Sequence, residues 1–178
     1  VELKDTKLVF AVGTVLGTLP QKQRIGDVIV ADCILPSHPG ATVMMRKPVS
    51  FKDAVKPELT SAWPSESQSH FGDKDIPEDR PRVHHGAMAS LPTPIENDQF
   101  APHEPLGVGV GLYEIADAAI CARKQWLIAT AIRGHVTGPP LDEQQKDQED
   151  DGPSLAPAAA ADFAQWLLSR EAMDPYLK

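Results

Sequence analysis

The sequence predicts an α/β fold in which helices cover a buried sheet. Short runs of apolar and β-branched residues, such as 7–12 and 26–35, have the composition of buried strands. A segment at 109–123 instead repeats apolar residues every three or four positions, as one face of a helix does. It leads into a continuously apolar run at 126–132, and a helix followed by a fully buried strand is typical of α/β proteins.

Glycine and proline residues separate the expected strands. Gly13 is expected to end the first strand, and residues 13–25 carry turn signals up to the start of the second. Gly86 is expected to break a later strand. The predicted strands are 7–12, 26–35, 41–45, 82–88 and 126–132.

Three helices are expected, and the one at 109–123 has the clearest pattern. Its apolar face consists of Leu112, Ile115, Ala116, Ala119 and Ile120. The glycine run GVGVG at 107–111 is interpreted as a loosened helix start or a place of close helix packing, because glycine lets backbones approach closely. The other two helices are predicted at 51–59 and at 154–170, the latter capped by Ser154.

Length and composition indicate a single domain spanning 1–178. The chain has 178 residues, the size of an ordinary domain, and its 17 prolines predict long, stiff loops between the elements. The stretch 141–153 is polar and mostly acidic, so it is expected to be a solvated loop. Residues 171–178 are expected to form a short tail.

The charge and hydropathy patterns argue against two classes of partner. The chain carries 25 acidic and 17 basic residues, a net charge of -8, without a basic patch interleaved with aromatics, so no nucleic acid is expected as a partner. No window approaches the roughly 20 apolar residues of a membrane span, and we expect a soluble cytoplasmic protein. Because the chain opens at Val1 directly before a buried strand, a preceding segment is expected to be missing.

Four ordered segments resemble the nucleoside phosphorylase family, which includes purine and uridine phosphorylases and methylthioadenosine nucleosidases. They are VFAVGTVLG with IGDVIVAD, VHHGAMAS at 83–90, LGVGVGLYEIADAA at 106–119, and QWL at 125–127 with PAAAADFA at 157–164. The resemblance implies a three-layer fold, with a central mixed sheet flanked by helices and the N-terminal part missing. A sheet without its first strands is expected to expose an edge.

At the two positions where that family carries catalytic acids, this chain has none. The glutamate that holds the ribose hydroxyls is replaced by Val108 or a neighbouring glycine. The aspartate that supports protonation of the base falls on Gly134 or, in a second register, on Thr137. Cleaving an N-glycosidic bond needs an acceptor for the sugar and a proton donor for the base. The resemblance therefore implies a degenerate relative with little or no catalysis.

The resemblance also points to candidate site residues. His135 adjoins the vacated aspartate position and would be able to donate a proton, since imidazole titrates near neutral pH. His84 and His85 point to opposite faces of a strand, so no shared metal ion is expected, and no cofactor is expected either. The candidate ligand-binding residues are Gly13, Gly17, His84, Met88, Val108 and Gly134.

Three hypotheses for the function remain open. The first is a domain that binds a nucleoside or nucleotide or a protein partner, inside a larger multidomain protein or as a homo-oligomer. The alternative is an active nucleosidase or phosphorylase of purine nucleosides, with acid and base supplied by His135, Glu114, Asp117 or a neighbouring subunit. The third is a structural module for oligomerisation.

Overall fold

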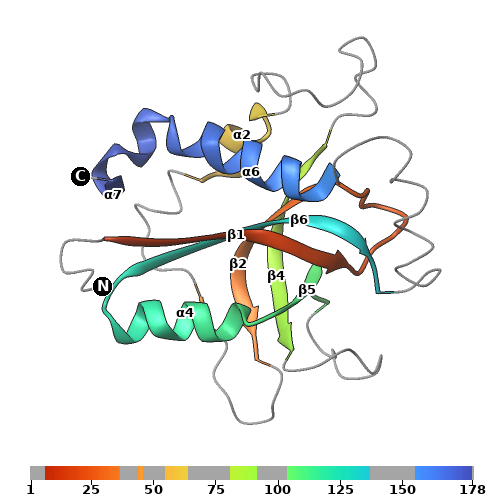
Figure 1. Ribbon diagram of the computed structural model, residues 1–178, viewed down its shortest axis with the longest axis horizontal. Coiled ribbons are helices and arrows are strands. Elements are labelled where there is room, and N and C mark those ends of the chain that lie inside the picture. The colour runs from red at the N-terminus through yellow and green to blue at the C-terminus, as the bar shows by residue number, and fades with distance from the viewer. Residues whose placement is uncertain are drawn as a thin grey trace.

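The computed structural model describes residues 7–36, 44–45, 55–63, 81–91, 104–136 and 155–177. Helices lie on both sides of a mixed sheet (Figure 1). The elements are β1 (Leu8–Gly17), β2 (Val28–Leu35), β3 (Met44–Met45), α2 (Pro57–Thr60), β4 (Val83–Leu91), β5 (Gly107–Val110), α4 (Leu112–Cys121), β6 (Gln125–His135), α6 (Leu155–Leu168), a 3₁₀ turn (Glu171–Met173) and α7 (Asp174–Leu177).

The strands pair in a nearly closed ring. Strand β1 pairs in parallel with β6, and β2 pairs in parallel with β4, which pairs in parallel with β5. Two antiparallel contacts join these groups, one between β2 and β6 and one between β5 and the end of β1, while β3 adds to β2. The predicted α/β class with a mixed sheet is confirmed.

Two glycines that were expected to end or break strands lie inside them. Strand β1 continues through Gly13, which pairs with Thr130, as far as Gly17. Strand β4 continues through Gly86, where a Cβ atom would lie 2.6 Å from Leu106 Cδ1. At Gly86 the prediction was wrong because a glycine inside a strand also marks a place where another group approaches the backbone closely. At Gly13 it was wrong because the pairing of β1 with β6 continues through the glycine.

The glycine run at 107–111 forms a strand and a turn instead of the predicted helix start. A Cβ atom at Gly107 would lie 2.6 Å from Cδ1 of Ile29, a residue of β2. A larger residue at position 107 would therefore collide with the Ile29 side chain. Gly111 has a φ of 76°, a left-handed conformation that favours glycine, and α4 begins at the next residue. The glycines do allow close packing, as expected, but Gly107 and Gly109 lie in a strand and not in a helix.

The remaining predicted elements differ from the structure mainly at their ends. Strand β6 is longer than predicted, and α6 ends at Leu168, before the predicted end at residue 170. The expected tail contains α7 and the fully buried Met173, so it contributes to the core. Of the predicted 41–45 strand and 51–59 helix, only 44–45 and 55–59 are described, and the acidic stretch 141–153 lies outside the described residues.

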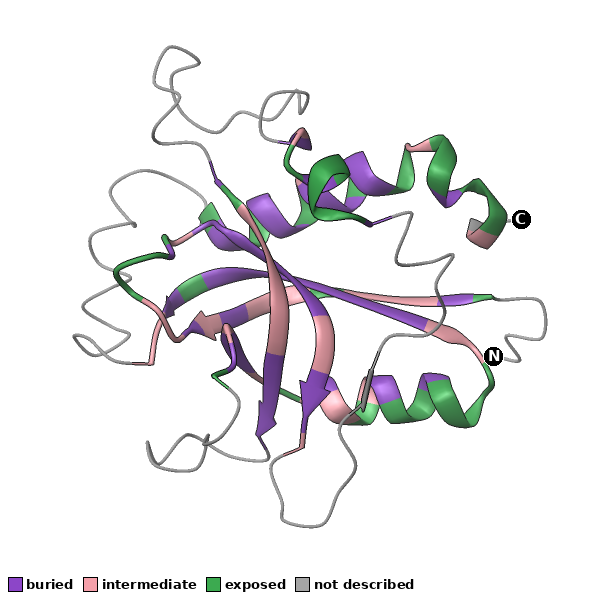
Figure 2. Ribbon diagram, turned by 180° about the vertical axis from the view of Figure 1, so that it is seen from behind, coloured by how far each residue is buried: buried purple, intermediate pink, exposed green. Residues whose placement is uncertain are grey.

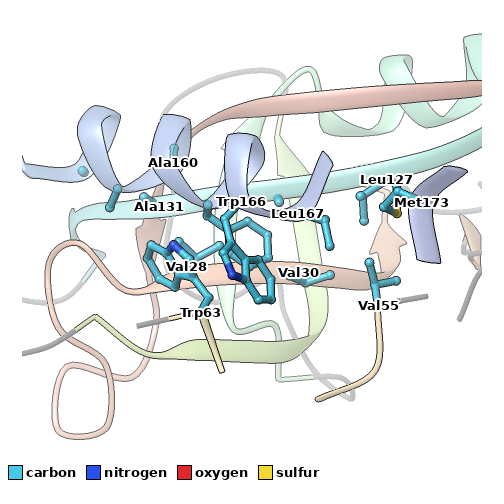
Figure 3. Close-up of a cluster of buried hydrophobic side chains, with 14 of the residues drawn as sticks. Val28, Val30, Val55, Trp63, Leu127, Ala131, Ala160, Trp166, Leu167 and Met173 are labelled. Carbon is cyan, nitrogen blue, oxygen red and sulfur yellow. The ribbon is translucent and has the colours of Figure 1, made fainter. Parts of the chain in front are cut away.

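One apolar core lies between α6 and the sheet. Helix α6 buries Phe163 and Leu167 against β1, β2 and β6, and its alanines keep the helix close to the strands. Figure 2 shows the buried face of α6 turned to the sheet. Trp63 meets Phe163 edge to face at 5.2 Å, and Trp63 Nε1 donates a hydrogen bond to Asp162 Oδ2 at 2.7 Å. Figure 3 shows Trp63 and Trp166 packed under the helix.

A second core fills the ring and is covered by α4. Its members come from β1, β2, β4 and β6, and α4 adds Leu112, Ala116 and Ala119. A Cβ at Gly107 would meet both Ile29 of β2 and Val15 of β1. These side chains therefore meet inside the ring. None of the described helices is long and apolar enough to cross a membrane.

Replacing Phe163 by alanine tests the first core. We expect Phe163→Ala to lower the free energy of unfolding by about 3–5 kcal/mol, because it leaves a cavity next to Trp63. Urea denaturation measures the change. Leu168→Ala is the control on the same helix, since Leu168 is 37% exposed, and should cost about 1 kcal/mol or less. Equal losses in the two variants would contradict this account.

Candidate functional site

The parallel strands β2, β4 and β5 end at one side of the sheet, where ligands bind in open α/β folds. Strand β5 ends at Val110, which is 72% exposed, and Gly111 turns the chain into α4. A Cβ at Gly111 would have no atom within 4 Å. Among the residues that the structure describes, none therefore covers this strand end.

A buried serine joins β4 to the start of α4 at this strand end. The Ser90 hydroxyl is 2% exposed and accepts a hydrogen bond from the Tyr113 N–H at 2.9 Å. Gly111, at the N-cap position, has no side chain for this task, so Ser90 satisfies a helix N–H from another strand. The hydroxyl in turn lies 3.5 Å from Glu114 Oε2 and donates to it.

Glu114 is therefore a carboxylate held at the open strand end. It lies in the first turn of α4, where negative charge interacts favourably with the helix dipole. Glu114 remains exposed, and an ionised carboxylate accepts hydrogen bonds from hydroxyl groups. Asp117 lies on the same helix, and its Oδ1 accepts a weak hydrogen bond from the Cys121 thiol. Sequence reasoning gave Glu114 only as an alternative acid or base.

Several of the predicted site residues meet where β1 and β6 end beside the start of β5. Leu16 lies opposite both Val108 and Gly134, and Gly17 lies opposite both Gly107 and His135. Gly134 and Val108 are thus two strand spacings apart, about 10 Å. The structure brings together Gly17, Val108, Gly134 and His135.

His135 is tied to the loop between β1 and β2. Its Nε2 lies 3.1 Å from the backbone oxygen of Gln23. A carbonyl oxygen can only accept, so the proton of this hydrogen bond is on Nε2. The buried Gln23 side chain accepts from the N–H groups of Thr18 and Leu19 and donates to the Leu106 carbonyl. His135 is therefore part of a brace that packs against Gly17, where a Cβ would lie 2.8 Å from Gln23 Oε1.

Two other candidates are buried in the core. Met88 is fully buried inside the ring, where its sulfur accepts a weak hydrogen bond from Thr130 Oγ1 at 3.8 Å. Val108 is 4% exposed and packs in a third apolar cluster with Leu91 and Leu35. The side chains of both residues already contact other parts of the protein.

The last two candidates lie apart from this group. His84 is at the start of β4, six residues before Ser90, which is about 20 Å along a strand. Gly13 is in the middle of β1, where a Cβ would have no atom within 4 Å. His84 and Gly13 therefore lie away from the strand ends that carry Gly17 and His135.

Asp27 is a polar residue that sequence reasoning missed. It is fully buried, and its carboxylate accepts hydrogen bonds from the N–H of Arg24 and the N–H of Arg82. Its Oδ2 lies 2.8 Å from His84 Nε2. Asp27 therefore joins the loop before β2 to the start of β4. The signal in the sequence that would have pointed to Asp27 is its position, because an acidic residue stands there directly before an apolar run.

Metal binding finds no support in the described residues. Within the ranges given above, no group of three or more His, Cys, Asp or Glu side chains is arranged to hold a metal ion.

The comparisons with solved structures identify the fold. The chain resembles a 5′-methylthioadenosine/S-adenosylhomocysteine nucleosidase from Neisseria meningitidis in complex with methylthio-immucillin-A, with 14% identity, a TM-score of 0.62, and coverage of 91% of this chain and 69% of that one. The chain therefore has the fold of these nucleosidase structures. The nucleosidase fold at this level of identity does not by itself assign an activity.

The chain is also similar to two further nucleosidase structures. The enzyme from Colwellia psychrerythraea, in complex with adenine, has 11% identity and a TM-score of 0.62, with coverage of 91% of this chain and 66% of that chain. The Arabidopsis thaliana 5′-methylthioadenosine nucleosidase in apo form has 12% identity and a TM-score of 0.60, with coverage of 94% and 65%. The chain thus spans about two thirds of these neighbours. No family model and no curated protein matches the sequence.

Removing the Ser90 hydroxyl tests how the start of α4 is held. We expect Ser90→Ala to lower the free energy of unfolding by about 1–2 kcal/mol, because it leaves the Tyr113 N–H without its acceptor. Denaturant unfolding measures the loss, and hydrogen exchange of the Tyr113 amide should become faster. Ser61→Ala is the control, since the Ser61 hydroxyl makes an exposed hydrogen bond to the Glu58 carbonyl. An unchanged Tyr113 amide would contradict the assignment.

Proposed function

We propose that this domain binds a nucleoside-like ligand at the open end of β4 and β5 and cleaves it slowly or not at all. The nucleosidase fold over 91% of the chain supports a nucleoside-type ligand. Two of the compared nucleosidases were solved with adenine or a methylthio-immucillin. At this strand end Val110 is 72% exposed, and the exposed carboxylate of Glu114 follows three residues after Gly111.

The observation that carries the proposal is the chemistry at the end of β6. The residues there are Arg133, Gly134, His135 and Val136, followed by Thr137, and none of them is a carboxylic acid. A departing base gains negative charge and needs a proton donor. Losing a positioned acid typically lowers a rate by about 10²- to 10⁴-fold, so efficient turnover by this route is not expected.

His135 is a poor substitute for that acid in its present position. Its Nε2 proton is engaged by the Gln23 carbonyl, and Gln23 is itself held by three further hydrogen bonds. Transfer of this proton to a ligand would require the brace to open. We therefore assign His135 a structural role in the loop between β1 and β2.

Glu114 is the residue that we assign to ligand binding. The side chain is exposed, and Ser90 orients its carboxylate through the contact at 3.5 Å. A carboxylate accepts hydrogen bonds from vicinal hydroxyl groups such as those of ribose, and such charge-assisted bonds are stronger than neutral ones. The ligand would therefore lie with its sugar near α4 and its base toward the ends of β1 and β6.

Calorimetry with adenosine, inosine and methylthioadenosine tests the binding. We expect saturable heat with at least one of them, and about tenfold weaker binding to Glu114→Gln, because an amide replaces the charged acceptor. Asp117→Asn is the matched control, since Asp117 lies on the same helix and contacts Cys121. No heat with any of the three nucleosides, or equal losses in both variants, would contradict this site.

Release of free base tests the catalytic part of the proposal. We expect no base above the uncatalysed background over several hours, with or without phosphate, because the end of β6 has no acid. The alternative is an active enzyme that uses Glu114, and the support for it is that Ser90 holds this carboxylate at the site. Base release that Glu114→Gln abolishes, and Asp117→Asn does not, would establish that alternative.

A further inference from the structure

Negative charge dominates the part of the chain that forms the proposed ligand site. Residues 83–122, from the start of β4 to the residue after α4, contain no lysine or arginine. The same stretch contains five carboxylic acids, which are Glu96, Asp98, Glu104, Glu114 and Asp117. Two of these acids lie three positions apart on α4, so they are neighbours on its surface. A ligand beside the first turn of α4 would therefore meet a negative field.

The described basic residues of the neighbouring elements lie away from Glu114. Along the chain after α4 the first is Arg123, nine positions after Glu114, which is about 14 Å at the rise of an α-helix. Arg82 precedes β4 and is eight residues before Ser90, which is about 26 Å along a strand. Arg133 lies on β6, and β1 separates that strand from β5. Exposed charges more than about 10 Å apart are largely screened at 0.1 M salt, so these cations offset the Glu114 carboxylate only weakly.

The Glu114 carboxylate has a defined position in this field. Its Oε2 lies 3.5 Å from the Ser90 hydroxyl, and Ser90 is 2% exposed and accepts from the Tyr113 N–H. A ribose ring is smaller than the Debye length, about 10 Å at 0.1 M salt. A charge on the 5′ carbon of a sugar bound at Glu114 would therefore interact with this carboxylate.

We propose that the site selects its ligand by the charge of the 5′ substituent, favouring a nucleoside with an ammonium group there and disfavouring one with a phosphate. The inference rests on the proposed ligand site at Glu114. At the dielectric constant of water, one unit charge within this range changes the affinity by about threefold. A phosphate carries nearly two negative charges, so its penalty should be about tenfold.

Three ligands that differ only at the 5′ position test the proposal. They are 5′-amino-5′-deoxyadenosine, adenosine and adenosine 5′-monophosphate, each titrated into the chain by calorimetry at about 20 mM salt. Relative to adenosine, we expect about threefold tighter binding of the amine and about tenfold weaker binding of the phosphate. At about 0.5 M salt the three affinities should converge, because added ions screen the carboxylate.

Two variants with the same change in net charge locate the effect. Glu114→Gln should reduce the roughly 30-fold spread between amine and phosphate to about threefold or less, because it removes the nearest negative charge. Glu171→Gln is the matched control, since Glu171 is exposed and follows α6, on the other side of the sheet from α4 (Figure 1). This variant should keep the spread of the wild type.

The outcomes separate this inference from the proposed function. Equal affinities of the wild type for the three ligands would overturn the inference and leave the ligand site in place. A spread that persists in high salt and in Glu114→Gln would also overturn it, since shape would then be the cause. If none of the three ligands binds, the proposed function itself fails and the inference fails with it.

Discussion

The pairing of β2 with β6 holds the two groups of strands together. Residues Val28, Ile29 and Val30 lie antiparallel to Ala131, Thr130 and Ala129, and this contact turns a row of strands into a ring. All of these residues are buried, so their backbone groups have no water to replace a lost partner. The ring in turn creates the interior that Met88, Val15 and Ile132 fill and that α4 covers.

Asp27 lies where three of these strands meet, and it supports that pairing. Its backbone oxygen accepts from the Ile132 N–H at 2.8 Å, while its side chain holds Arg82 and His84 at the start of β4. A buried carboxylate is costly unless hydrogen bonds satisfy it, and here backbone N–H groups and an imidazole do so. The histidine that the sequence suggested as a ligand contact is thus a partner of this aspartate at the opposite end of β4 from Ser90.

The proposed ligand site depends on one end of the ring. The ligand site uses the end of β4, the turn at Gly111 and the first turn of α4, which Ser90 connects. These groups are exposed where the pairing of the ring ends, which explains why a ligand would reach them without disturbing either core.

The sequence by itself determined the α/β class, the positions of most strands and helices, and the lack of a carboxylic acid at residues 133–137. These features depend on local composition and periodicity, which can be read along the chain. Only the tertiary structure decided that Gly13 and Gly86 lie within strands, that His135 braces Gln23, and that Ser90 holds Glu114. Each of these depends on residues distant in sequence, such as Leu106 against Gly86, and no local pattern records which side chain will approach a glycine or a histidine after folding.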